Sequence, residues 1–121
     1  MIAITGYPGS GKTTFANDLA KKSKTKVLHT DDFIKAVPFK DIPEHLIAIV
    51  KVAKPDIIEG VQVARMLRKG HRDKTFSADT VIWVEGGNEG NKISAMVAKA
   101  FEEWKKESGQ KVYTIEEDEE D

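Results

Sequence analysis

The sequence contains no cysteine, and this absence excludes several kinds of chemistry. Without cysteine the chain has no disulfide, no thiolate zinc site and no cysteine nucleophile. The absence also agrees with a reducing compartment, so we expect a cytoplasmic protein.

Long apolar runs are missing as well. No stretch of about 18 apolar residues occurs, so we expect no membrane-spanning helix. The first residues lack the basic and apolar segments of a signal peptide. Repeats and proline-rich linkers are absent, and 121 residues, 40% of them hydrophobic, suffice for one domain with one core.

Acidic residues are unevenly distributed along the chain. Residues 116–121 hold six of the 20 acidic side chains, which leaves 19 basic and 14 acidic side chains elsewhere, a net charge of +5. We predict a single domain over residues 1–115 and an acidic, disordered tail over residues 116–121. The alternative is that this tail folds back over a basic site and competes with phosphates.

Residues 6–13 read GYPGSGKT and match the pattern G-x-x-x-x-G-K-[ST] of a phosphate-binding loop. An apolar run over residues 2–5 predicts a strand before the loop, and the next residues predict a helix after it. Glycines let backbone N–H groups surround a phosphate, and the start of the helix adds its positive dipole end. In this pattern Lys12 reaches the β- and γ-phosphates and Thr13 ligates Mg²⁺. The residues predicted to bind a nucleoside triphosphate are Gly6, Pro8, Gly9, Ser10, Gly11, Lys12, Thr13 and Thr14.

Strand and helix patterns alternate along the rest of the chain, which favours a parallel sheet with helices on both faces. Apolar residues recur at helical spacing in each helix, and glycines mark the expected ends of the last two helices at Gly70 and Gly109. The expected strands are residues 2–5, 27–30, 56–60, 81–84 and 111–115. The expected helices are residues 12–22 and 43–53, a third that starts near Val63 and a fourth that starts near Ile93.

Carboxylates stand at the ends of the second and third expected strands. Asp31 and Asp32 follow the second strand, and Glu59 ends the third. Because ligands bind beyond the carboxyl ends of parallel strands, these carboxylates are expected beside the triphosphate. Phosphoryl transfer needs a cation to offset charge and a carboxylate to deprotonate the acceptor hydroxyl, and this pattern offers both.

The phosphate loop, residues 31–33 (DDF) and residues 57–60 (IIEG) together resemble the P-loop kinases of the uridine kinase type, over roughly residues 2–60. The resemblance implies a three-layer α/β sandwich with a five-stranded parallel sheet in the order 2-3-1-4-5. It also implies that Asp31 is the catalytic base and helps to hold Mg²⁺, and that Glu59 lies on the Mg²⁺ side. Asp32 is then either a carboxylate that supports the groups in contact with the ligand or a residue that caps the next turn. Phe33 either packs near the acceptor or belongs to the core.

The chain departs from this family after the fourth strand. Family members usually carry an arginine-rich lid there, but residues 85–91 are few and include no arginine. Without a lid the crevice would admit a bulky acceptor, such as a hydroxyl on a nucleic acid. In this respect the chain is similar to the small phage-type kinases that phosphorylate hydroxymethylated pyrimidines in DNA.

A basic cluster lies before the fourth strand and has two interpretations. It is either a solvated helix face with its loop, or a set in which Arg65 or Arg68 binds a phosphate of the acceptor while Arg72 and Lys74 extend the patch. His29 and His45 have no partners at metal-ligand spacing, so we interpret both as structural.

The leading hypothesis is a phosphotransferase that uses ATP and Mg²⁺ and acts on a nucleoside, a nucleotide or a nucleic-acid-linked hydroxyl. Two alternatives remain, an NTPase without a phospho-acceptor and a nucleotide-binding regulatory module. The pocket for the base of the nucleotide is not marked by any motif. By position, its candidates are the loop over residues 86–91 and the last expected strand.

Overall fold

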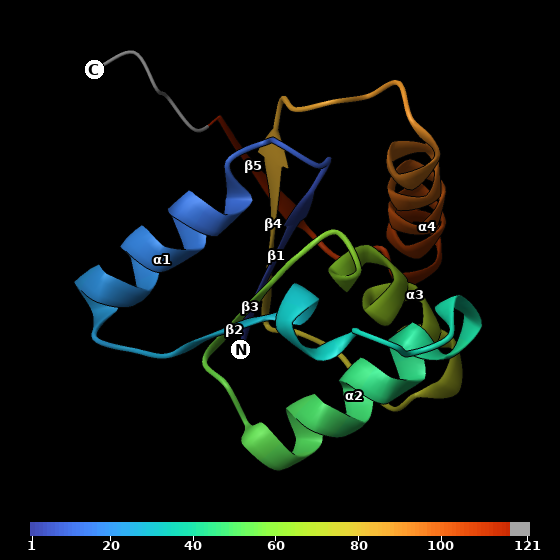
Figure 1. Cartoon of the computed structure of the whole chain (residues 1–121), viewed down its shortest axis with the longest axis horizontal. Helices are drawn as coiled ribbons and strands as arrows, with labels where there is room; N and C mark the ends of the chain where they lie inside the picture. Colours follow the sequence, from blue (N-terminus) through green and yellow to red (C-terminus); the bar gives the residue numbers. More distant parts are fainter. Residues whose placement is uncertain (117–121) are drawn as a thin grey trace.

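Five parallel strands form the centre of the computed structural model, which describes residues 1–116 (Figure 1). Every pair of neighbouring strands is parallel, and their order is β2-β3-β1-β4-β5. The parallel sheet predicted from the alternation and the strand order implied by the resemblance are both confirmed. The strands are β1 (Ile2–Gly6), β2 (Val27–His29), β3 (Ile57–Glu59), β4 (Thr80–Glu85) and β5 (Val112–Glu116).

The strand β1 is central because its sequence is apolar on both faces. Ala3 and Ile4 point to opposite faces, and neither is exposed to solvent. On one side β1 pairs with β3, where Ile2 is aligned with Ile57, and on the other it pairs with β4, where Ile2 is aligned with Thr80. A strand covered on both faces needs this uninterrupted apolar run.

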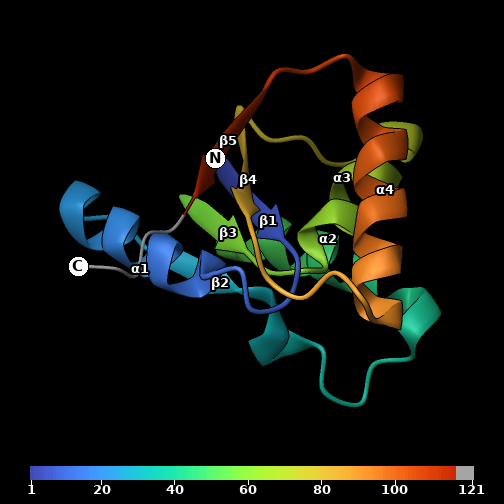
Figure 2. The same ribbon diagram turned by 90° about the horizontal axis from the view of Figure 1, so that it is seen from above.

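The helix α1 covers one face of the sheet, and α2, α3 and α4 cover the other (Figures 1 and 2). The right-handed crossover rule explains this division. The chain moves across the sheet in one direction from β1 to β2 and in the opposite direction from β2 through β3 and β4 to β5, so the first helix lies opposite the other three. The helices are α1 (Lys12–Ser23), α2 (Ile42–Ala53), α3 (Val63–Asp73) and α4 (Lys92–Ser108), with short 3₁₀ turns η1 (Thr30–Phe33) and η2 (Phe39–Asp41).

The larger part of the core lies between the sheet and the three helices α2, α3 and α4. Leu46, Met66 and Val97 come from these helices and are completely buried there. A smaller cluster on the other face packs Ala16 of α1 against Ile4 and its neighbours. Packing in these two clusters holds the sheet in place, and the candidate site lies at the ends of its strands.

The end of α3 differs from the prediction. We expected the helix to end at Gly70, but it continues to Asp73, and Lys74 caps it with a left-handed φ of 58°. Gly70 is required inside the helix for a steric reason, because a β-carbon there would lie 2.5 Å from Cβ of Phe76. The expectation for Gly109 is confirmed, since it caps α4 with a φ of 65°.

The described residues contain no helix that is both long and apolar enough to cross a membrane. Glu116 belongs to β5, and the rest of the expected acidic tail, residues 117–121, lies outside the described part of the chain.

Candidate functional site

The phosphate loop connects β1 to α1 in the geometry that its sequence predicts. Gly9 and Gly11 adopt left-handed φ values of 78° and 88°, which L side chains rarely adopt. Gly6 is needed for a different reason, because a β-carbon there would lie 2.6 Å from the carbonyl oxygen of Val84. The helix begins immediately after Gly11, so its free N–H groups face the loop.

Lys12 is almost completely buried at the start of α1, with 8% of its surface exposed. Its Nζ donates a hydrogen bond to the carbonyl oxygen of Tyr7 at 3.0 Å. Burial lowers the pKa of Lys12, while the nearby carboxylates of Glu59 and Asp31 act in the opposite direction. The structure therefore brings Lys12, Glu59 and Asp31 into one electrostatic environment, as the sequence predicts.

Glu59 ends β3 and points into this site with only 4% of its surface exposed. Its Oε2 accepts a hydrogen bond from Oγ1 of Thr13 at 3.2 Å. The same oxygen lies 2.5 Å from Nδ1 of His29. A carboxylate only accepts hydrogen bonds, so Nδ1 of His29 carries the proton in this contact. Two of the three predicted metal-side residues, Thr13 and Glu59, are therefore in direct contact.

His29 was interpreted as a structural residue from the sequence, and its contact with Glu59 was missed. Both residues end neighbouring parallel strands, and they are aligned in the strand register. The position of both residues at strand ends could have indicated this contact, because side chains at equal register positions of adjacent strands lie close together. The strand order implied by the resemblance already places β2 beside β3, so the contact could have been inferred from that order.

The two aspartates after β2 are placed differently. Asp31, in η1, is close enough to Lys12 to affect the pKa of its ammonium group. Asp32 and Phe33 instead line a cavity of about 280 Å³ beside β2, together with Lys54. No residue of the phosphate loop lines that cavity.

The chain segments that follow β2 and β3 approach each other closely. Gly60 follows Glu59 with a φ of 148°, and a β-carbon there would lie 1.9 Å from Oγ1 of Thr30. Thr30 is completely buried, directly before Asp31. Only glycine at position 60 allows the chain to pass this close to Thr30, so Gly60 sets the spacing between the segments that carry Asp31 and Glu59.

The segment after β4 braces the phosphate loop. The backbone N–H of Asn88 donates to the carbonyl oxygen of Pro8 at 2.8 Å, and a β-carbon at Gly87 would lie 2.6 Å from that same oxygen. Asn91 then caps α4 by accepting a hydrogen bond from the N–H of Ser94 at 2.8 Å. The segment supports the loop from the side.

The basic cluster of α3 surrounds a cavity of about 210 Å³, and Lys40 contributes to its wall. Arg65 is 8% exposed, its guanidinium lies 3.9 Å from the ring centre of Phe39, and it donates to Oε1 of Gln62 at 3.1 Å. Burial, with a smaller effect of Arg68, lowers the pKa of Arg65.

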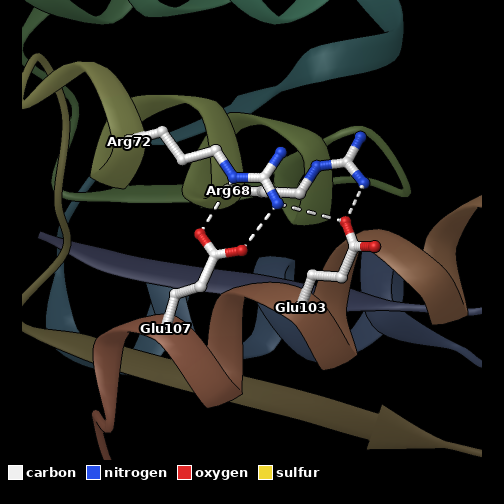
Figure 3. Close-up of polar contacts among 4 residues, drawn as sticks. All are labelled: Arg68, Arg72, Glu103 and Glu107. Carbon is white, nitrogen blue, oxygen red and sulfur yellow. Dashed lines mark hydrogen bonds and ion pairs between the residues drawn. The ribbon is translucent and has the colours of Figure 1, made fainter.

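Other arginines of this cluster bind α4 (Figure 3). Arg68 contacts Glu103 at 2.8 Å, and Arg72 contacts Glu103 at 3.3 Å and Glu107 at 2.6 Å. These hydrogen bonds lower the pKa of both glutamates. Neither interpretation made from the sequence included a link between α3 and α4.

The oxygen groups at the site fit Mg²⁺. Residues 1–116 contain no group of three or more histidine and acidic side chains arranged to hold a metal ion. Magnesium needs fewer protein ligands in nucleotide sites, because phosphates and water complete its octahedron. Thr13 and Glu59, already in contact, together with Asp31 supply hydroxyl and carboxylate oxygens of the type that Mg²⁺ prefers. Ser10 has a buried hydroxyl without a hydrogen-bond partner in the described residues, a donor suited to a phosphate in the same loop.

The phosphate loop between β1 and α1 and the order of the parallel strands define a P-loop nucleotide-binding protein. Residues 1–100 match the profile of a family described as an AAA domain, and the chain belongs to that family.

Two curated relatives share part of the sequence. One, named "Putative adenylate kinase", comes from Methanosarcina acetivorans and is 31% identical over 65 residues, which are 54% of this chain and 31% of that protein. The other, UvrABC system protein A of Malacoplasma penetrans, is 42% identical over 59 residues, which are 47% of this chain and 6% of that protein. The chain therefore spans less than a third of the length of either relative.

Among solved structures, the chain is similar to deoxyadenosine kinase from M. mycoides with bound dCTP. The two share 15% sequence identity with a TM-score of 0.47, and the match covers 95% of this chain and 89% of that one.

Proposed function

We propose that the protein is a Mg²⁺-dependent phosphotransferase that moves the γ-phosphate of ATP to a hydroxyl group. The observation that carries this proposal is the convergence of Asp31 and Glu59 on Lys12 and Thr13. A phosphate loop by itself supports only binding. Two carboxylates beside its lysine and hydroxyl add the groups that transfer requires.

Binding of the triphosphate uses the loop backbone and Lys12. The N–H groups of the loop and of the first turn of α1 point toward the phosphates, and the Lys12 ammonium offsets the charge that develops on them. Because Lys12 is buried, water screens this attraction only weakly. Backbone groups of Gly6, Pro8, Gly9, Ser10, Gly11 and Thr14 complete the proposed site.

Thr13 and Glu59 would hold Mg²⁺, with Asp31 at its edge. When bound, the ion supplies charge neutralisation on the phosphates and helps to orient them. The contact between Thr13 and Glu59 keeps these two side chains in position.

Asp31 is the proposed base because it is exposed at the mouth of the site and lies near Lys12. Its carboxylate accepts the proton of the acceptor hydroxyl while the hydroxyl oxygen forms a bond to the γ-phosphorus. The bond between that phosphorus and the bridging oxygen breaks, and ADP leaves with the electron pair.

The proposed acceptor is a nucleoside, a nucleotide or a nucleic-acid-linked group such as a hydroxymethylated pyrimidine in DNA. A cavity with Lys40, Arg65 and Lys69 in its wall has the charge to contact a phosphate on such an acceptor. Arg68 also lines this cavity but is bound to Glu103, so Arg65 is the stronger of the two proposed contacts. Asp32 and Phe33 line a different cavity, which His29 also lines, and they are the other proposed acceptor contacts.

One observation favours the second candidate function, an NTPase. The segment between β4 and α4 is short, contains no arginine and packs beside the phosphate loop, so it does not supply the arginine-rich lid that would exclude water. Incubation with ATP alone separates the two functions. Fast release of phosphate without an acceptor would contradict the phosphotransferase proposal and support the NTPase. The absence of any turnover with or without acceptors would instead support a regulatory nucleotide-binding module.

The direct test is labelled ATP with a panel of nucleosides, nucleotides, and unmodified and hydroxymethylated DNA. We expect labelled product in one of these classes. Asp31→Asn should lower the transfer rate by about 10²–10⁴-fold while ATP still binds. The matched control is Asp18→Asn, an exposed position of α1, which should transfer at the wild-type rate. Full transfer by Asp31→Asn would contradict the assignment of the base.

A further inference from the structure

A third cavity lies beside the phosphate loop, between α4 and the strands β4 and β5. Its volume is about 500 Å³, within the range of cavities that hold small organic ligands. Tyr7 belongs to the phosphate loop and also lines this cavity. The phosphate site and the cavity therefore share a wall.

Aromatic rings form one part of this cavity. Trp83 lies between Tyr7, at a centroid distance of 5.2 Å, and Phe101, at 4.7 Å. Phe101 is buried, whereas Tyr7 and Trp83 are only half buried. Their ring surfaces are thus available to a flat ligand, and stacking on such rings stabilises bound bases.

Carboxylates form the polar part of the cavity. Glu85, Glu89 and Glu102 line it, and Lys105 is its one basic residue. Within residues 1–116, the side chains of Glu85 and Glu89 form no ion pair or hydrogen bond. Carboxylates only accept hydrogen bonds, so the cavity suits a ligand that carries N–H donors and repels phosphate groups.

This cavity and the cavity at α3 therefore differ in chemistry. The smaller one is lined by Lys40 and basic residues of α3, whereas the larger one combines aromatic rings with carboxylates. A phosphate is favoured in the first, and a flat, uncharged ring with N–H groups is favoured in the second.

We propose that the cavity between α4 and the strands β4 and β5 binds the heteroaromatic base of a nucleoside or nucleotide. This inference rests on the proposed function, because it places a base next to the loop that binds phosphates. The base belongs either to the triphosphate donor or to a nucleoside acceptor, and both offer the same ring and N–H chemistry.

The test fills the cavity and leaves the phosphate loop intact. Ala98 of α4 lines the cavity and is half buried, so Ala98→Phe occupies part of its volume. Ala95 lies on the same helix but is exposed, so Ala95→Phe is the matched control. Calorimetric titrations would use adenosine, guanosine, cytidine and thymidine, non-hydrolysable ATP and GTP analogues with Mg²⁺, and tripolyphosphate as a probe without a base.

We expect Ala98→Phe to weaken binding of base-containing probes by about tenfold or more, with tripolyphosphate affinity unchanged. Ala95→Phe should bind every probe as the wild type does. A loss seen with nucleosides identifies the acceptor's base, and a loss confined to the triphosphate analogues identifies the donor's base. Wild-type affinity of Ala98→Phe for every base-containing probe would overturn the proposal.

A second measurement covers the case in which Ala98→Phe does not fold. The sequence has two tryptophans, so Trp104→Phe leaves Trp83 as the single fluorescent reporter in the cavity. Base-containing probes should quench its emission, and Glu85→Gln with Glu102→Gln, both exposed, should weaken that response. An unchanged emission with every probe would overturn the proposal. If wild-type protein binds nucleosides in the cavity but not tripolyphosphate, the proposed function fails and the base site stands.

Discussion

At the scale of single residues, Glu59 connects the phosphate loop to the neighbouring strand β2. Its Oε2 receives a hydrogen bond from Thr13 on the phosphate-loop side and another from His29 on the neighbouring strand. These two hydrogen bonds, together with the burial of Glu59, restrict its side chain to few rotamers. A carboxylate fixed in this way is preorganised for a cation, and His29 is the residue that orients it.

We predict that His29→Ala raises the Mg²⁺ concentration needed for half-maximal phosphoryl transfer by about 10–100-fold, since residues that orient metal ligands have effects of this size. His29→Asn retains an N–H donor near the position of Nδ1 and should behave more like the wild type. The measurement is the transfer rate against Mg²⁺ concentration, with thermal melts to compare folding. An unchanged Mg²⁺ dependence in His29→Ala would show that His29 does not orient Glu59.

At the scale of secondary-structure elements, the helix α3 departs most from its sequence pattern. Three helices end at lysines in the left-handed region, Lys24, Lys54 and Lys74, where glycine would avoid a cost of about 1–2 kcal/mol. The glycine that α3 does contain serves the packing of Phe76 and lies one turn before the helix ends.

Gly70→Ala is therefore predicted to destabilise the protein, although the same change in a helix interior usually stabilises by about 0.5–1 kcal/mol. The new β-carbon would lie 2.5 Å from Cβ and 2.7 Å from the carbonyl oxygen of Phe76, and overpacking of this kind costs about 1–3 kcal/mol. Urea denaturation measures the change. Asn17→Ala on the exposed surface of α1 is the control, expected within about 0.5 kcal/mol of the wild type. A gain in stability for Gly70→Ala would mean that the segment around Phe76 moves without cost.

The ion pairs between α3 and α4 predict a dependence of stability on pH. Hydrogen bonds from Arg68 to Glu103 and from Arg72 to Glu107 lower the pKa of each glutamate below its unfolded value. Groups with a depressed folded pKa contribute stability above the unfolded pKa, near pH 4, and this contribution is lost as the pH falls through the folded pKa. The pairs should therefore stabilise the protein at neutral pH and cease to do so in acid.

Arg72→Gln tests this directly. Thermal melts should show a small loss of stability at pH 7, a smaller loss in high salt, and a difference from the wild type that shrinks as the pH is lowered below about 4. Lys22→Gln, an exposed change on α1, serves as the control and should show no comparable pH dependence. An equal loss at pH 3 and pH 7 would indicate that Arg72 acts through packing of its side chain.

At the scale of the whole molecule, the crevice lies where the strand order reverses. From β1 the chain runs toward β2 on one side, whereas β3 leads across β1 to β4 on the other. Ligands bind beyond the strand ends at such a point, since the connections there leave in opposite directions. The phosphate loop and Glu59 occupy this position.

Occupancy of the crevice should raise the stability of the entire domain. At a ligand concentration of about 100 times Kd, binding to the folded state adds about 2.7 kcal/mol, which raises Tm by roughly 10 °C for a domain near this size. We expect this rise with a non-hydrolysable ATP analogue and Mg²⁺, and a smaller one after EDTA removes the metal. Lys12→Ala should abolish it. The same rise in Lys12→Ala would place the nucleotide outside the phosphate loop.

The sequence by itself determined the local features of this protein. The phosphate loop, the strand before it, the helix after it and the cap at Asn91 depend on backbone conformations that a few adjacent residues decide. The alternation of strands and helices predicted the parallel sheet, and the position of Asp31 and Glu59 at strand ends predicted that both would lie near the phosphate loop.

The tertiary structure decided what depends on residues far apart in the chain. It separated Asp31 from Asp32, placed His29 on Glu59, and turned Arg68 and Arg72 toward α4. It also enclosed the cavity beside Tyr7 and kept α3 helical past Gly70. No local pattern records these outcomes, because each depends on how side chains pack between elements that are far apart in the chain.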